Sequence, residues 1–160
     1  MRILTVVLFL LSFKMVFAQQ VAIGTIDSED KIEFSEKGRR AIKIAYLRSF
    51  TDGRKLDTAF IEKLGQVKYL VILGSKGNVK SRSAVSILII NNTVNIATNT
   101  EMKTCSNGAC SNCQFFIENS KVVACKCNDN GSISNNCSFR NNDGAFFYSV
   151  VSKIMESTKN

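Results

Sequence analysis

Apolar and polar residues alternate over several short stretches of the chain, which is the pattern of strands that bury one face. Residues 21–26 and 31–34 are predicted to be short strands, and residues 67–73 form a nearly continuous apolar run that predicts a buried strand. Turn residues occupy positions 51–53 and 74–78. The first half of the chain is therefore expected to consist of short elements separated by turns.

The clearest local pattern is a hairpin within residues 83–98. Its turn is predicted at Asn91-Asn92, because asparagine tolerates the positive φ angles that two-residue hairpin turns require. The apolar face would hold three facing pairs: Ile89 and Val94, Ile87 and Ile96, Val85 and Thr98. The opposite face would hold Leu88 with Asn95, and Ile90 with Thr93. A slip of one residue would reverse these faces, so the turn and the apolar pattern predict the same register.

Residues 40–50 fit two patterns. Ile42, Ile44 and Tyr46 alternate as in a strand, whereas Ile42, Ala45, Tyr46 and Phe50 form a helical stripe. The β-branched residues Ile42 and Ile44 and a turn predicted at residues 36–38 favour the strand.

A helix is predicted next, because Leu56, Phe60, Ile61 and Leu64 recur at helical spacing. Asp57 would cap its start, and Gly65 would end it.

A C-terminal helix is predicted from the stripe of Phe147, Val150, Val151 and Ile154, with Asp143 as its cap. This helix is expected to pack on the core. Together the elements indicate an α+β fold, in which an antiparallel sheet packs with one or two helices beside a cysteine-rich, disulfide-stapled hairpin region.

The first eighteen residues have the pattern of a secretory signal peptide. Arg2 precedes an apolar run at residues 3–13, Lys14 interrupts that run, and Val16 and Ala18 place small residues before the predicted cleavage site. The run is shorter than the roughly 20 residues of a membrane-spanning helix. We therefore expect cleavage and secretion, to the medium or to a periplasm. The expected organisation is a signal peptide at 1–18, a basic core at 19–104, a cysteine-rich region at 105–142 and the terminal helix at 143–160.

Six cysteines lie in the cysteine-rich region: Cys105, Cys110, Cys113, Cys125, Cys127 and Cys137. The first three form C-x4-C-x2-C, which resembles the cluster-binding loop of plant-type [2Fe–2S] ferredoxins over ten residues. That resemblance implies that Cys105, Cys110 and Cys113 bind iron and that the protein transfers electrons.

Export favours a disulfide framework over that cluster, because thiols pair in an oxidising compartment. Six cysteines allow 15 pairings, which the sequence does not resolve. Residues 113–127 are predicted to form a second hairpin around Asn119-Ser120. Cys125 and Cys127 would share one face of its second strand and could take separate partners, and Cys113 could bridge across to either.

The chain has 21 Lys and Arg against 13 Asp and Glu, and it has no histidine. The absence of histidine excludes Ser-His-Asp catalysis, Cys-His catalysis and histidine-ligated zinc. We expect a non-catalytic binding protein with no cofactor. The excess charge fits either a solvated basic surface that aids solubility or an anionic partner such as a glycan, a cell-wall polymer or lipid head groups, without a specific nucleic-acid signature. The candidate contacts are Lys37, Arg39, Arg40, Lys43, Arg48, Arg54 and Lys55.

Two further expectations concern chemistry. A hydrolase of the glycosidase type is the alternative function, and it would need two of the carboxylates Glu33, Glu36, Asp52, Asp57, Glu62 and Glu101. In a eukaryotic host, Asn91, Asn130 and Asn136 would be glycosylation sites, since each begins an Asn-x-Ser/Thr triplet.

Overall fold

A computed structural model of the chain describes residues 19–157, except 30, 108–109, 111 and 128–136. The predicted signal peptide and two of the predicted glycosylation sites, Asn130 and Asn136, lie outside the described residues. Within these limits, no helix is long and apolar enough to cross a bilayer.

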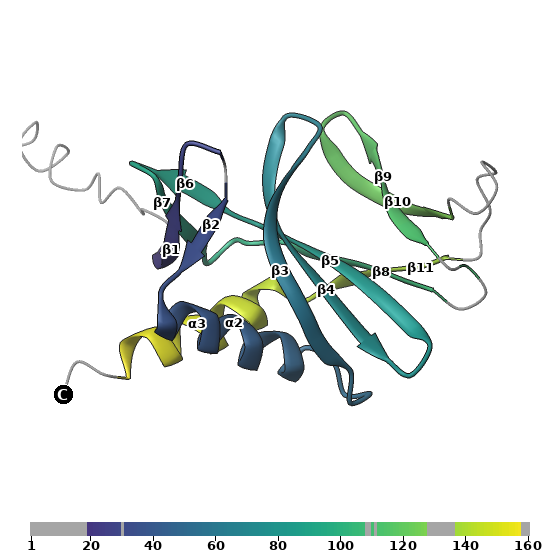
Figure 1. Cartoon of the computed structure of the whole chain (residues 1–160), viewed down its shortest axis with the longest axis horizontal. Helices are drawn as coiled ribbons and strands as arrows, with labels where there is room; N and C mark the ends of the chain where they lie inside the picture. Colours follow the sequence, from purple (N-terminus) through teal and green to yellow (C-terminus); the bar gives the residue numbers. More distant parts are fainter. Residues whose placement is uncertain (1–18, 30, 108–109, 111, 128–136, 158–160) are drawn as a thin grey trace, which may run out of the picture.

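The fold is α+β, as predicted, and its described residues form two antiparallel sheets, two helices and a separate hairpin (Figure 1). The four-stranded sheet has the order β2 (Ile32–Phe34), β1 (Gln20–Ile26), β7 (Thr93–Ala97) and β6 (Leu88–Ile90). The five-stranded sheet has the order β11 (Cys137–Asn142), β8 (Met102–Asn107), β5 (Val79–Ser86), β4 (Val67–Lys76) and β3 (Lys55–Leu64). The hairpin pairs β9 (Cys113–Glu118) with β10 (Lys121–Cys127).

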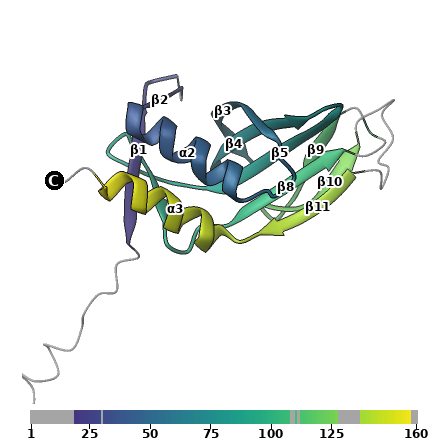
Figure 2. The ribbon, with the colours of Figure 1, turned by 90° about the horizontal axis from the view of Figure 1, so that it is seen from below.

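The strand β4 of the five-stranded sheet is buried on both faces. Leu70 and Ile72 of β4 enter the core cluster that contains residues of α2 (Glu36–Arg48) and α3 (Gly144–Glu156). Tyr69 and Val71, which alternate with them, enter a second cluster with Phe115 and Val122 of the hairpin. Figure 2 shows the two helices side by side, on the face of the sheet opposite the hairpin in Figure 1.

The strand predicted at residues 40–50 is wrong, because α2 occupies residues 36–48. Its start is fixed by Ser35, whose Oγ accepts a hydrogen bond from the Gly38 N–H at 2.9 Å. That cap also replaces the turn predicted at 36–38. Ile42, Ala45 and Tyr46 are almost wholly buried. Burial of this helical stripe therefore favours the helix over the strand.

The helix predicted at residues 56–64 is also wrong, because this segment is β3, which pairs with β4 along its length. Asp57 lies at a register shift between Leu56 and Thr58 and caps no helix. Gly65 has a φ of +66° in the tight β3–β4 turn, where glycine takes this angle without strain. Pairing with the long strand β4 therefore overrides the local helical spacing.

The hairpin at Asn91-Asn92 is confirmed over its inner three pairs, which join Leu88 to Asn95, Ile89 to Val94 and Ile90 to Thr93. Both turn residues have positive φ angles, of 49° and 61°. The outermost predicted pair is wrong: Val85 belongs to β5, where it faces Leu70 on one side and Met102 on the other. The chain changes sheets after Ser86, so the hairpin is shorter than its apolar pattern suggests. The turn predicted at 74–78 is likewise shorter, because β4 continues to Lys76.

The disulfide framework is confirmed, with bonds that join Cys105 to Cys125, Cys110 to Cys127 and Cys113 to Cys137. Cys125 and Cys127 take separate partners, as predicted. Cys113 faces Cys127 in the hairpin ladder, yet each bonds to a cysteine outside the hairpin. The three bonds therefore tie the hairpin to β8, to the loop that carries Cys110, and to β11.

The C-terminal helix begins as predicted. Asp143 Oδ1 accepts a hydrogen bond from the Phe146 N–H at 3.0 Å. Phe147 and Val151 are fully buried in the core cluster that also holds Ile42 and Tyr46 of α2. The two helices therefore form one layer against the sheet.

Candidate anion-binding cleft

Four basic side chains of α2 form an exposed group, which we name the cationic face: Arg39, Arg40, Lys43 and Arg48. The helix orients them outward because its opposite side is buried under Ile42, Ala45 and Tyr46. Within the described ranges, none of the four forms an ion pair. Their charge is therefore available to an external anion.

A cleft of about 480 Å³ lies beside this face, between α2 and the edge strands β2 and β3. Arg39 and Lys43 line it from the helix. They are four residues apart, so they lie one turn apart on the same side of α2. Figure 1 shows α2 below β2 and beside the lower part of β3.

The rest of the cleft is mainly apolar. Ile42 is 2% exposed. The other apolar lining residues pack partly buried against the main core cluster: Ile32, Phe34, Leu56 and Ala59. The register shift at Asp57 places both Leu56 and Ala59 against that cluster, although they are three residues apart. The cleft therefore combines an apolar lining with two cations, and Asp57 and Thr58 complete it.

The remaining predicted contacts lie elsewhere. Lys37 donates a hydrogen bond to the Met155 carbonyl, which links α2 to α3. Arg54 is only 8% exposed and bonds to Asp52. Lys55 is exposed at the start of β3 but does not line the cleft. The structure thus brings two of the seven candidate residues, Arg39 and Lys43, into one cleft.

Arg54 contacts Asp52 and Phe50 within the fold, so its charge stabilises the structure and does not face a partner. Its Nη2 lies 2.6 Å from Asp52 Oδ2, and its guanidinium lies 3.9 Å from the centre of the Phe50 ring. The hydrogen bond from Arg54 lowers the pKa of Asp52 to about 2, and its bond to Asp52 raises the pKa of Arg54. The pair therefore stays charged over the physiological range and fixes the loop before β3.

The Tyr46 hydroxyl also takes part in a hydrogen-bond network inside the fold. It lies 2.9 Å from Ser81 Oγ, which in turn donates to the Gly74 carbonyl at 3.1 Å. Burial raises the pKa of Tyr46 above its ordinary value. Gly74 must lack a side chain, because a Cβ there would lie 2.1 Å from the Tyr46 hydroxyl.

Four of the six carboxylates considered for hydrolysis have partners. Asp52, Glu62 and Glu101 pair with Arg54, Arg82 and Lys103. Asp57 accepts a hydrogen bond from Ser75 Oγ at 2.9 Å. These contacts commit the four carboxylates to interactions within the fold.

The sequence interpretation missed the apolar lining of the cleft. Ile32 and Phe34 lie in a segment that was predicted to be a strand, whereas Leu56 and Ala59 lie in the segment that was predicted to be a helix. Their convergence depends on tertiary pairing, for which the sequence offers no local pattern.

Asn91 lies exposed in its turn, as a glycosylation site requires.

Comparisons with models of known protein families, with curated protein sequences and with solved structures find no match to this chain.

Proposed function

We propose that the protein is a secreted, non-catalytic binding protein that captures an anionic molecule at the cleft beside α2. The observation that carries this proposal is the pairing of Arg39 and Lys43 with an apolar lining in one cleft. Cations attract a negatively charged group, and the lining accepts apolar surface. Among the anionic partners considered, a single-chain lipid with an anionic head group combines both features.

The signal-peptide pattern and the three disulfides support secretion. Lack of histidine and the partners of the carboxylates support a binding role over hydrolysis. The iron–sulfur alternative has less support, because each cysteine of its motif is bonded to another cysteine.

Titration of the oxidised protein with octanoate, decanoate and dodecanoate tests the proposal. Affinity should rise with chain length, since each buried CH2 contributes about 0.8 kcal/mol. The double variant Arg39→Gln/Lys43→Gln should bind dodecanoate roughly tenfold more weakly, which corresponds to about 1.4 kcal/mol.

The matched control is Lys121→Gln/Arg140→Gln, which removes two exposed charges from β10 and β11. Its affinity should equal that of the native protein. Equal weakening in both double variants, or no binding of any of the three carboxylates, would contradict the proposal.

A further inference from the structure

Two of the three disulfides lie against each other. The Sγ atoms of Cys110, Cys113 and Cys137 all lie within 4.8 Å of one another, although Cys110 is bonded to Cys127 and Cys113 to Cys137. A thiolate released from one bond would therefore have a sulfur of the other bond as its neighbour. Such attack by a thiolate on a disulfide sulfur is the elementary step of disulfide exchange.

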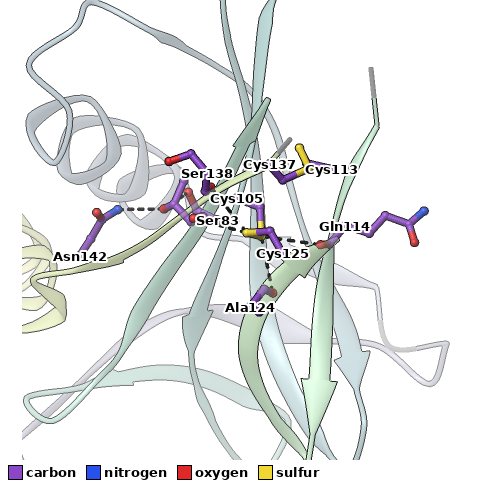
Figure 3. Close-up of a disulfide and its surroundings, with 10 residues drawn as sticks. Ser83, Cys105, Cys113, Gln114, Ala124, Cys125, Cys137, Ser138 and Asn142 are labelled. Atoms are coloured by element: carbon purple, nitrogen blue, oxygen red, sulfur yellow. Dashed lines mark hydrogen bonds between the residues drawn. A yellow bond between two sulfur atoms is a disulfide. The ribbon is translucent and has the colours of Figure 1, made fainter. Parts of the chain in front are cut away.

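The two bonds differ in exposure. Cys110 and Cys127 are only 1% and 4% exposed, whereas Cys113 and Cys137 are both half-buried. In Figure 3 the Cys113–Cys137 bond lies apart from the Cys105–Cys125 bond, in which Cys105 is fully buried and Cys125 is half-buried. Of the three bonds, Cys113–Cys137 is the one in which both cysteines are half-buried, so an external thiol reaches it first.

A cleft of about 260 Å³ leads to Cys113. Lys80 and Arg82 line it, together with Asn107, Asn112, Asp57 and the fully buried Cys105. The Lys80 N–H donates to Asn107 Oδ1 at 2.7 Å, which fixes the backbone at that position. Arg82 pairs with Glu62, whereas within the described part of the chain the Lys80 ammonium has no carboxylate partner. Lys80 therefore favours the approach of a negatively charged thiol.

We propose that this cleft and the adjacent sulfur atoms form a thiol–disulfide exchange site for a small anionic thiol, of which reduced glutathione is the probe. The proposal does not rest on anion binding beside α2, although Asp57 lines both clefts. It also gives a role to the C-x2-C spacing of Cys110 and Cys113, which are not bonded to each other in the native pairing.

The exchange proceeds in three balanced steps. The thiolate of the small molecule attacks Sγ of Cys113, which lines the cleft, forms a mixed disulfide and expels Cys137 as a thiolate. The Cys137 thiolate attacks Sγ of Cys127 and expels Cys110 as a thiolate. The Cys110 thiolate attacks Sγ of Cys113 and releases the small thiolate. The native bonds Cys110–Cys127 and Cys113–Cys137 are replaced by Cys110–Cys113 and Cys127–Cys137. The number of disulfides is unchanged, so there is no net oxidation.

Trypsin digestion after exposure to reduced glutathione and alkylation at low pH distinguishes the two pairings. The native bonds connect tryptic peptides 104–121, 122–126 and 127–140 into one cluster, since cleavage follows Lys103, Lys121, Lys126 and Arg140. After exchange, peptide 127–140 should separate from the cluster with an internal disulfide, because both Cys127 and Cys137 lie within it. If it stays in the cluster throughout the exposure, or if Cys105–Cys125 opens first, the proposal is overturned.

Two variants test the mechanism. Cys110→Ser/Cys127→Ser removes the second bond, so the mixed disulfide with glutathione should accumulate at Cys113. Lys80→Gln should slow the reaction with glutathione by about threefold, as expected for loss of one exposed charge contact. The reaction with cysteamine, a cationic thiol, should not slow.

Lys153→Gln, on the exposed surface of α3, is the matched charge control and should leave both rates unchanged. Equal slowing of the two thiols in Lys80→Gln, or equal effects of the two lysine variants, would contradict the assignment of Lys80.

Discussion

Asp52 and Arg54 show how one ion pair fixes a loop next to the core. Arg54 is almost buried, whereas the Asp52 side chain is 37% exposed. The folded chain lowers the pKa of Asp52 from 3.8 to about 2. Because the pKa is lowered, the carboxylate stabilises the fold above pH 4 and loses this effect as the pH falls through about 2.

Asp52→Asn tests this contribution. At pH 6 the variant should unfold with a free energy about 1 kcal/mol lower than the native protein, a small value because solvent screens the exposed carboxylate. The difference should shrink between pH 4 and pH 2. Urea unfolding at pH 6, 4 and 2 measures it, and a constant difference over this range would contradict the assigned pKa.

At the scale of elements, the two hairpin turns and the cap of α3 were predicted correctly, whereas the cap at Asp57 and the turn at 36–38 were not. The pairs Asn91-Asn92 and Asn119-Ser120 each adopt positive φ angles in their hairpin turns, and Asp143 caps α3 as its position predicted. These interactions are local, so the residues that make them are neighbours in sequence.

Interactions between distant segments explain the two wrong predictions. A strand was predicted where α2 lies and a helix where β3 lies. Residues 40–50 fit both periodicities and residues 56–64 have helical spacing, but in both segments the outcome depends on partners far along the chain. The β3 segment pairs with β4, and α2 covers the sheet that this pairing creates. For the same reason, the sequence identified Arg39 and Lys43 as cationic but could not place Leu56 and Ala59 beside them.

The cap of α2 provides a prediction at this scale. Ser35→Ala removes the acceptor for the Gly38 N–H and the donor to the Ile23 carbonyl at 3.2 Å. The variant should lose about 1 kcal/mol of unfolding free energy. Ser149→Ala, on the exposed surface of α3, should change stability little, and a similar loss in both variants would show that the Ser35 cap contributes nothing specific.

At the scale of the whole molecule, the disulfides hold the hairpin over the five-stranded sheet. The Cys105–Cys125 bond joins β8 to β10 through a cysteine in the second core cluster. The apolar contacts in that cluster come from only a few residues of the hairpin, among them Phe115 and Val122. The bond therefore adds a covalent constraint where the apolar contact is small.

Cys105→Ala/Cys125→Ala should lower the unfolding free energy by about 3 kcal/mol, the value for a loop of this length. Loss of the buried sulfur from the second core cluster adds to this effect. Cys113→Ala/Cys137→Ala, which removes the half-buried bond, should cost less. Thermal unfolding of both variants provides the comparison, and the reverse order would mean that the buried bond is not the main constraint on the hairpin.

The most direct test of the binding account is to locate a bound anionic lipid by amide chemical-shift changes in the oxidised protein during titration with dodecanoate. The account predicts saturable changes confined to β2, the Arg39–Lys43 turn of α2 and residues 56–59 of β3. Changes spread evenly over the basic surface, or confined to the hairpin, would contradict it.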